Sequence, residues 1–285
     1  MRIAIIGLGL IGGSIGLALK ENNWRRAEVI GYARRQETAS LACKLGAVDR
    51  TEADARKVVR GAHIVIVATP VLTVREIFEI IAPELSDGAI VTDTASTKVQ
   101  VLQWARELLP PIASFVGGHP MAGKEVSSIK AATADLFNKC TYCLIPLPKT
   151  KPSALQTMKD MVKVLGANPM VIKAEEHDRL VAGISHLPLL ISSALVLVTT
   201  KNPSWIKMSR LAASGYRDLT RLASGNPEIS AHIFLSNRAA IVSWIDEFIK
   251  ELQKLRELVA DGSEDIERVL TIANKARNRW LEKRC

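Results

Sequence analysis

Residues 2–16 read RIAIIGLGLIGGSIG and predict a strand, a tight turn and the start of a helix. The apolar run at 3–6 leads directly into GLGLIG at 7–12, which has the spacing G-x-G-x-x-G. In this motif the first glycine allows the turn, the second lets the backbone approach a pyrophosphate, and the third allows close packing of helix on strand. The unpaired N–H groups and the positive end of the helix hold phosphates. The cofactor-binding residues expected here are Gly7, Gly9, Leu10, Ile11 and Gly12.

The composition is that of an ordinary globular protein of one or two domains. The chain has 285 residues and a formal net charge of +9, which attracts anionic ligands. Aromatic residues make up only 5% of the chain, and no basic run is interleaved with them. We therefore expect a small anionic ligand and no nucleic-acid partner.

Two features favour a cytoplasmic protein with no membrane partner. The first strand follows the initiator Met almost directly, so we expect no signal or transit segment. The longest apolar stretch, 187–198, is too short to span a bilayer and contains Pro188.

Cys140 and Cys143 have C-x-x-C spacing without a second pair or a nearby histidine, which favours buried thiols over a metal site.

A second strand, at 29–32, ends where an NAD enzyme usually carries an acidic residue for the ribose hydroxyls. This chain has Arg34 and Arg35 there, and guanidinium groups pair well with a ribose 2′-phosphate. The pair therefore predicts NADP, with NAD still possible. The alternative is that one or both arginines are solvated residues at a helix start.

Two further strand ends are expected beside the cofactor, because open α/β sheets bind ligands beyond the carboxyl ends of their strands. The apolar run that begins at residue 63 predicts a buried strand ending near Thr69 and Pro70. Residues 89–92 predict the next strand, which runs into the hydroxyl-rich turn DTASTK at 93–98. We expect Thr94 beside the cofactor and another hydroxyl of this turn in the ligand crevice.

The segment GGHPMAG at 117–123 follows a short predicted strand at 114–116. Its glycines and the His-Pro step predict an extended, tightly turned loop. On such a loop beside a nicotinamide, His119 is a candidate acid–base residue. The alternative is a hydrogen-bonded structural histidine.

Strand patterns recur at 142–146 and 168–172 and then stop, and residues 174–285 have helical periodicity. The fold class is therefore α/β: a Rossmann-type dinucleotide-binding domain at 1–173, followed by an all-α substrate-binding and dimerisation domain at 174–285. A single helix is expected after Pro227. Apolar residues repeat along it with a seven-residue period from Ile241 to Val259, which suits a homodimer or, equally, a bundle within one chain.

Polar residues of the helical half divide into three groups. His186 precedes a long apolar helix and suits a buried core position, whereas His177 lies in a charged helix start and is expected to be exposed. Arg217 and Arg221 are four residues apart and share one face if this segment is helical. Such a pair can grip carboxylates or form a solvated basic face, and the residues alone favour neither.

Five motifs, taken in order, resemble the prephenate/arogenate dehydrogenases of tyrosine biosynthesis. They are GLGLIGGSIG at 7–16, DTASTK at 93–98, GGHPMAGKE at 117–125, EEHDRLVAGISHLP at 175–188 and GYRDLTRLA at 215–223. The resemblance runs to about residue 260, and GGHPMAG, ISHLP and RDLTR together are far more specific than the glycine motif.

The resemblance implies NAD(P)-dependent oxidative decarboxylation of a dicarboxylate, prephenate or arogenate, to 4-hydroxyphenylpyruvate or tyrosine. It implies that His119 draws the proton from the ring hydroxyl and that Ser96 hydrogen-bonds this hydroxyl, His119 or the nicotinamide. NADP use and arogenate use often go together in that family, so the arginine pair slightly favours arogenate. The substrate-binding residues that the resemblance implies are His186, Arg217, Arg221 and Glu125.

Two positions depart from the family pattern. Leu189 stands where a second histidine is common, and Lys124 replaces a residue that is usually small and uncharged. Lys124 adds positive charge near the pocket and leaves side-chain specificity open. Two other function classes are carried as alternatives: a dehydrogenase or reductase of another small carboxylate, such as a pyrroline-carboxylate reductase or a β-hydroxyacid dehydrogenase, and a non-catalytic dinucleotide-binding sensor.

Overall fold

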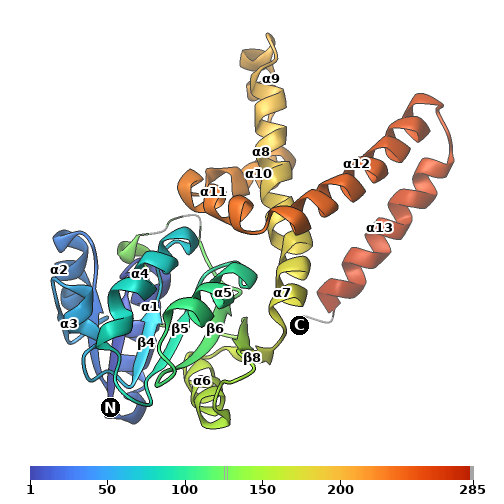
Figure 1. Ribbon diagram of the computed structural model, residues 1–285. Coiled ribbons are helices and arrows are strands. Elements are labelled where there is room, and N and C mark those ends of the chain that lie inside the picture. Colours follow the sequence, from blue (N-terminus) through green and yellow to red (C-terminus); the bar gives the residue numbers. More distant parts are fainter. Residues whose placement is uncertain (125, 127, 283–285) are drawn as a thin grey trace. The chain divides into compact units, whose positions relative to one another are not determined.

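The structure is a computed structural model that describes residues 1–124, 126 and 128–282. In its first part strands and helices alternate (Figure 1). The strands are β1 (Arg2–Ile6), β2 (Glu28–Tyr32), β3 (Arg50–Thr51), β4 (Ile64–Val67), β5 (Ile90–Asp93), β6 (Ser114–Pro120), β7 (Thr141–Pro146) and β8 (Asn168–Val171). The helices between them are α1 (Leu10–Glu21), α2 (Gln36–Lys44), α3 (Ala55–Val59), α4 (Val74–Ile81), α5 (Val99–Leu108) and α6 (Pro152–Val164).

All eight strands form one sheet in the order β3-β2-β1-β4-β5-β6-β7-β8. Neighbouring strands are parallel except β6 and β7, which pair antiparallel. The strand order reverses between β1 and β4, and ligands bind at such a switch point in open α/β sheets. The short strand β3 has no counterpart in the sequence prediction, because two residues carry no periodic signal.

The sheet is covered on both faces, because alternate residues of each strand face opposite sides. Ile3 and Ile5 pack in one core cluster with α1, α2 and α6, whereas Ala4 and Ile6 pack in a second cluster with α3, α4 and α5. The predicted Rossmann-type doubly wound layer is confirmed.

Strand β6 continues through residues predicted to be a tightly turned loop, so that prediction is wrong for 117–120. Gly117–Pro120 pair in register with β7, and His119 lies opposite Cys143. A Cβ atom at Gly118 would lie 2.4 Å from the carbonyl oxygen of Asp93. Glycine is therefore needed here for the close approach of two strands rather than for a turn.

After β8 the described chain is helical. Its helices are α7 (Ala174–Val181), α8 (Leu187–Thr200), α9 (Trp205–Leu211), α10 (Ser214–Thr220), α11 (Pro227–Ser236), α12 (Arg238–Ala260) and α13 (Asp265–Glu282). The single helix expected after Pro227 is broken at Asn237, whose backbone leaves the helical region. The chain groups into two compact units, Met1–Arg238 and Ala239–Cys285. The second unit holds α13 and nearly all of α12, which run in opposite directions (Figure 1).

Helices α7 and α8 form one continuous run, because a π-helical segment at Ala182–His186 joins them. The run Ala174–Thr200 has 27 residues and a mean hydropathy of 2.0 in its most apolar window, of which 28% is buried. By length and composition this run could cross a membrane. The expectation that the apolar segment is too short is therefore wrong, because the helix that contains it is longer than residues 187–198. The core helix of a soluble protein passes the same test, and the first half of this run holds buried polar residues described below.

Candidate active site

The glycine-rich turn after β1 has the geometry that a dinucleotide needs. Gly7 has φ +99°, and a Cβ atom there would lie 2.4 Å from the oxygen of Ala68. A Cβ atom on Gly12 would lie 2.0 Å from the oxygen of Gly7, so α1 can pack this closely only with glycine. Because Gly9 offers no side-chain cap, the N–H groups of the first turn of α1 are available to a phosphate.

The ends of two other strands, β2 and β4, meet this turn. The N–H group of Gly7 donates to the oxygen of Tyr32 at 2.9 Å, which places the end of β2, and with it the Arg34-Arg35 segment, beside the turn. Both arginines are exposed. Thr69, which follows β4, has a buried hydroxyl oxygen with no partner among the described residues. A polar atom left unpaired at this edge fits a crevice that receives a cofactor.

His119 lies near the end of β6 with only 8% of its surface exposed. Its Nδ1 is 2.8 Å from Nε2 of His177, and the two rings meet edge to face with centroids 5.1 Å apart. His177 in turn lies with Nδ1 2.8 Å from Oδ1 of Asp178. The catalytic candidate therefore belongs to a chain of three polar side chains from β6 and α7.

His177 is buried, with 1% exposure, so the prediction that it is exposed is wrong. The charged residues Glu175 and Glu176 led to that prediction, and both are indeed exposed. His177 and Asp178 occupy the opposite side of the same helix and face β6 and α5. Neighbouring residues of a helix point in directions about 100° apart, so a charged start does not determine where each one points.

Asp178 connects three segments of the site. Its carboxylate accepts the N–H groups of Lys98 at 2.8 Å and Val99 at 2.9 Å, which caps the start of α5. Its backbone oxygen accepts from Nδ2 of Asn237 at 2.8 Å, and the same Nδ2 lies 3.3 Å from Nδ1 of His186. The break between α11 and α12 therefore places a polar side chain into this network.

His186 is buried, with 1% exposure, and has one unpaired ring nitrogen. Nδ2 of Asn237 donates to the carbonyl oxygen of Asp178, which fixes the orientation of the Asn237 amide. Nδ1 of His186 therefore accepts a hydrogen bond from the same Nδ2. Burial, together with His177, lowers the pKa of His186 to about 4, although Asp178 opposes this shift. The neutral ring then carries its proton on Nε2, a buried donor with no acceptor in the described structure.

A buried ion pair supports the strand that carries His119. Lys98 and Asp93 are both fully buried and bonded to each other. Nζ of Lys98 also donates to the oxygen of Gly118 at 2.7 Å, and the N–H group of Gly118 donates to Asp93 at 3.2 Å. The pKa of Lys98 is lowered by burial and raised in part by Asp93. These contacts hold the backbone next to His119.

The environment of His119 disfavours its charged form. Burial lowers its pKa well below the usual value, and the nearby His177, Lys98 and His186 side chains act in the same direction. The ring is therefore neutral at physiological pH and able to accept a proton.

The other predicted site residues have these positions. Ser96 and Thr94 are partly exposed in the turn between β5 and α5. Arg217 is exposed on α10, and Arg221 is exposed one turn later in the 3₁₀ segment Arg221–Ser224, so the two share a face. That segment packs on α8, where the N–H group of Ala223 donates to Ser192 at 3.0 Å. Ser192 is about 9 Å along the helix from His186. Glu125 lies outside the described residues.

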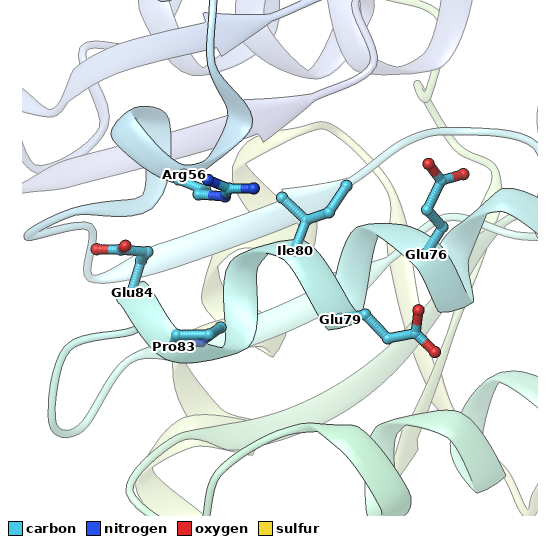
Figure 2. A pocket seen from close by; sticks show the side chains of 6 residues that line it. All are labelled: Arg56, Glu76, Glu79, Ile80, Pro83 and Glu84. Carbon is cyan, nitrogen blue, oxygen red and sulfur yellow. The ribbon is translucent and has the colours of Figure 1, made fainter.

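A hollow on the outer surface of α3 and α4 is separate from this site (Figure 2). Three glutamates, Arg56, Ile80 and Pro83 line it, and its Glu84 is already paired with Arg60. Within the described part of the chain, no three histidine, cysteine, aspartate or glutamate side chains could hold a metal ion together. Cys143 is buried in β7, and Cys140 precedes that strand.

Sequence reasoning missed Asp93, Lys98, His177, Asp178 and Asn237. Four of these lie in or beside motifs that carry the family resemblance, DTASTK and EEHDRLVAGISHLP, so their position in the motifs was the available signal. Asn237 had no such signal, because it lies inside a segment that reads as continuous helix.

A dinucleotide-binding turn and a buried, neutral histidine near the end of β6 together suit hydride transfer coupled to proton removal. Fold and site together define the class of dehydrogenases that use a nicotinamide dinucleotide.

Comparison with known proteins narrows this class. Family models for the nucleotide-binding domain and the dimerization domain of prephenate dehydrogenase match residues 15–171 and 173–273. A prephenate dehydrogenase of Bacillus subtilis is 38% identical over 259 residues, which cover 90% of this chain and 70% of the relative. The chain belongs to the prephenate dehydrogenase family and is an NAD(P)-dependent dehydrogenase.

Solved structures agree with this assignment. Prephenate dehydrogenase from A. aeolicus in complex with hydroxyphenyl propionate and NAD+ superposes with a TM-score of 0.90 at 29% identity, and 98% of each chain is covered. The Synechocystis arogenate dehydrogenase superposes with a TM-score of 0.83 at 31% identity and covers 98% of this chain and 100% of its own.

Proposed function

We propose that this protein converts arogenate or prephenate to tyrosine or 4-hydroxyphenylpyruvate by oxidative decarboxylation, with NADP preferred over NAD. The observation that carries the proposal is the neutral, buried His119, tied through Nδ1 to His177 at the carboxyl edge of the sheet. The reaction needs a base at the ring hydroxyl at the moment when hydride leaves the same carbon. When bound, the nicotinamide supplies the hydride acceptor.

His119 takes the hydroxyl proton on Nε2, because Nδ1 is engaged with His177. As the C–H bond breaks, its electron pair leaves as hydride, and the O–H electron pair forms the carbonyl. The C–C bond to the ring carboxylate then breaks and releases carbon dioxide. Its electron pair moves through the ring onto the carbonyl oxygen, which takes the proton back from His119 as the ring becomes an aromatic phenol. Ser96, in the turn between β5 and α5, provides a hydroxyl that can hydrogen-bond the reacting oxygen. The second catalytic assignment is therefore Ser96.

The substrate carries two carboxylates, and each is costly to desolvate without a partner. We assign Arg217 and Arg221, on the shared face near α8, to one carboxylate, where guanidinium groups can form two parallel hydrogen bonds. His186 offers its buried Nε2–H to an oxygen of the substrate. Glu125 completes the proposed substrate-binding set.

The cofactor assignment rests on the turn and the strand ends that surround it. The N–H groups of Leu10, Ile11 and Gly12 face the pyrophosphate, and Thr69, Pro70 and Thr94 border the nicotinamide side. Arg34 and Arg35 follow β2 beside the turn, where the 2′-phosphate of NADP would lie.

Assembly and location form a separate part of the proposal. We propose a homodimer through the helical region, a domain division after Lys173, and a cytoplasmic enzyme. Each of the two compact units carries large exposed apolar side chains in the helical region, and exposed apolar surface favours an interaction site. Examples are Val198 at 72%, Ile206 at 72%, Leu211 at 84% and Val259 at 70% exposure.

Initial rates with prephenate and arogenate, each with NADP and NAD, test the function directly. Cofactor reduction is followed by absorbance at saturating substrate. We expect turnover of at least one substrate, with a higher kcat/KM for NADP. Tight binding of NADP without turnover of either substrate would instead support a non-catalytic dinucleotide-binding sensor. Turnover of a different small carboxylate would support a dehydrogenase or reductase of that carboxylate.

A further inference from the structure

The chain His119–His177–Asp178 joins a residue of β6 to the first half of α7, which lies 58 residues away in sequence. Each of its two links is 2.8 Å long, which is a normal hydrogen-bond distance. All three side chains are nearly inaccessible to water, with exposures of 8%, 1% and 4%. A hydrogen-bond chain in such a place has few alternative arrangements.

The direction of every hydrogen bond in the chain follows from Asp178. Its carboxylate accepts two backbone N–H groups at the start of α5, one on each oxygen, so both oxygens act as acceptors. Nδ1 of His177 therefore donates to it. A neutral His177 ring that donates through Nδ1 has its lone pair on Nε2, and this lone pair accepts from Nδ1–H of His119.

The same reasoning leaves Nε2 of His119 without a proton. A neutral imidazole has one donor and one acceptor nitrogen, and here the donor is already used toward His177. The lowered pKa of His119 agrees with a ring that has one proton rather than two.

We propose that His177, oriented by Asp178, is a positioning residue that sets the tautomer of His119, so that an unprotonated Nε2 faces the substrate hydroxyl. The effect of the tautomer on catalysis rests on the proposed function, whereas the hydrogen-bond geometry does not. When His119 accepts the proton, its Nδ1–H remains donated to His177, and the carboxylate of Asp178 stabilises the positive charge through that ring.

Variants of His177 test this role better than variants of Asp178, because Asp178 also caps α5 and its loss would disturb folding. In H177Q the side-chain oxygen can still accept from Nδ1 of His119. In H177M a side chain of similar volume has no comparable acceptor. His63 is exposed and outside the site, so H63Q is the matched control.

The direct readout is the protonation state of each ring nitrogen, measured by long-range ¹H–¹⁵N NMR on the full-length enzyme labelled at histidine. The chain has only five histidines, so single His→Gln variants assign the signals. We expect His119 of the wild type to be protonated on Nδ1 and unprotonated on Nε2, and H177Q to keep this state. In H177M we expect His119 to lose its single fixed tautomer.

Kinetics supply the second readout. A wrong tautomer in a comparable histidine site lowers kcat by up to about 10⁴-fold, and the partial loss expected in H177M is about 10²-fold in kcat with KM little changed. H177Q should recover most of that loss, and H63Q should match the wild type. A structural role alone would lower the melting temperature of H177M without a difference in tautomer or kcat from H177Q.

Protonation of Nε2 rather than Nδ1 in wild-type His119 would overturn the proposal, even if H177M failed to fold. Equal kcat values for folded H177M and H177Q, with an unchanged His119 tautomer, would overturn it as well. If the wild type shows the expected tautomer but turns over neither substrate, the proposed function fails while the tautomer assignment is supported.

Discussion

Gly118→Ala is expected to damage catalysis through the backbone, without touching any reacting group. A Cβ atom at this position would lie 2.4 Å from the oxygen of Asp93 and 3.1 Å from both Thr92 Oγ1 and Tyr142 Cε1. An ordinary contact begins near 3.4 Å, so the end of β6 must move by about 1 Å from β5. The next residue is His119, which moves with it.

The size of the effect follows from that displacement. A misplacement of about 1 Å can cost about 10²-fold in rate, which corresponds to about 2.7 kcal/mol in the barrier. The same shift strains the bonds of Gly118 to Asp93 and Lys98. Overpacking of a filled interior adds about 1–3 kcal/mol of lost stability.

The assay compares kcat at saturating substrate, NADP affinity and melting temperature in two neighbouring variants. Gly117→Ala is the matched control, because its Cβ atom would meet the flexible end of Leu102 at 3.0 Å and the oxygen of Ile145 at 3.3 Å. We expect kcat to fall about 10²-fold in G118A and less than about 3-fold in G117A. NADP affinity should be unchanged in both, since α1 and its turn are not affected.

A folded G118A enzyme with kcat within about 3-fold of the wild type would refute the reasoning. It would mean that β6 absorbs the added methyl group without moving His119. Equal losses of kcat in G117A and G118A would also refute the reasoning. The atom nearest to the new Cβ is a flexible side-chain carbon in G117A but a backbone oxygen in G118A.

Four further predictions concern the proposed site residues. His119→Ala should lower kcat by about 10²–10⁴-fold with NADP binding retained. In the wild type, burial lowers the pKa of His119 well below 6.5, so kcat/KM should stay level as pH falls through 6.5 and decline only at lower pH; a decline centred at 6.5 or above would contradict this. Arg221→Ala should raise KM for the substrate by about 10-fold or more with a smaller change in kcat. An unchanged KM would contradict the assignment of Arg221 to a substrate carboxylate. Arg34→Ala with Arg35→Ala should weaken NADP binding selectively, whereas equal losses for NAD and NADP would contradict the assignment of the 2′-phosphate.

The first half of the fold could be predicted because its signals are local. A buried strand, a glycine turn and a helix start are adjacent along the chain at 2–16, and the close contacts of Gly7 and Gly12 confirm why glycine is needed there. The helical second part is also a local signal. His119 could be selected because its sequence neighbours are unusual, although its segment proved to be a strand rather than a loop.

What surrounds His119 could not be predicted from local patterns. The burial of His177 depends on β6, which lies 58 residues earlier, and Asp178 caps a helix 80 residues earlier. Helical periodicity shows that a residue faces a given side of its helix, but not which distant strand covers that side.

The sequence by itself determined the division into an α/β part and a helical part, the dinucleotide turn and the family, because each depends on residues that are close together or on a recognisable combination of motifs. Only the tertiary structure decided that Asn237 interrupts a helix to bond Asp178 and His186, and that two histidines from β6 and α7 share a hydrogen bond. The physical reason is that a buried polar group must find a partner wherever packing brings one within reach, and that partner is set by the assembled fold.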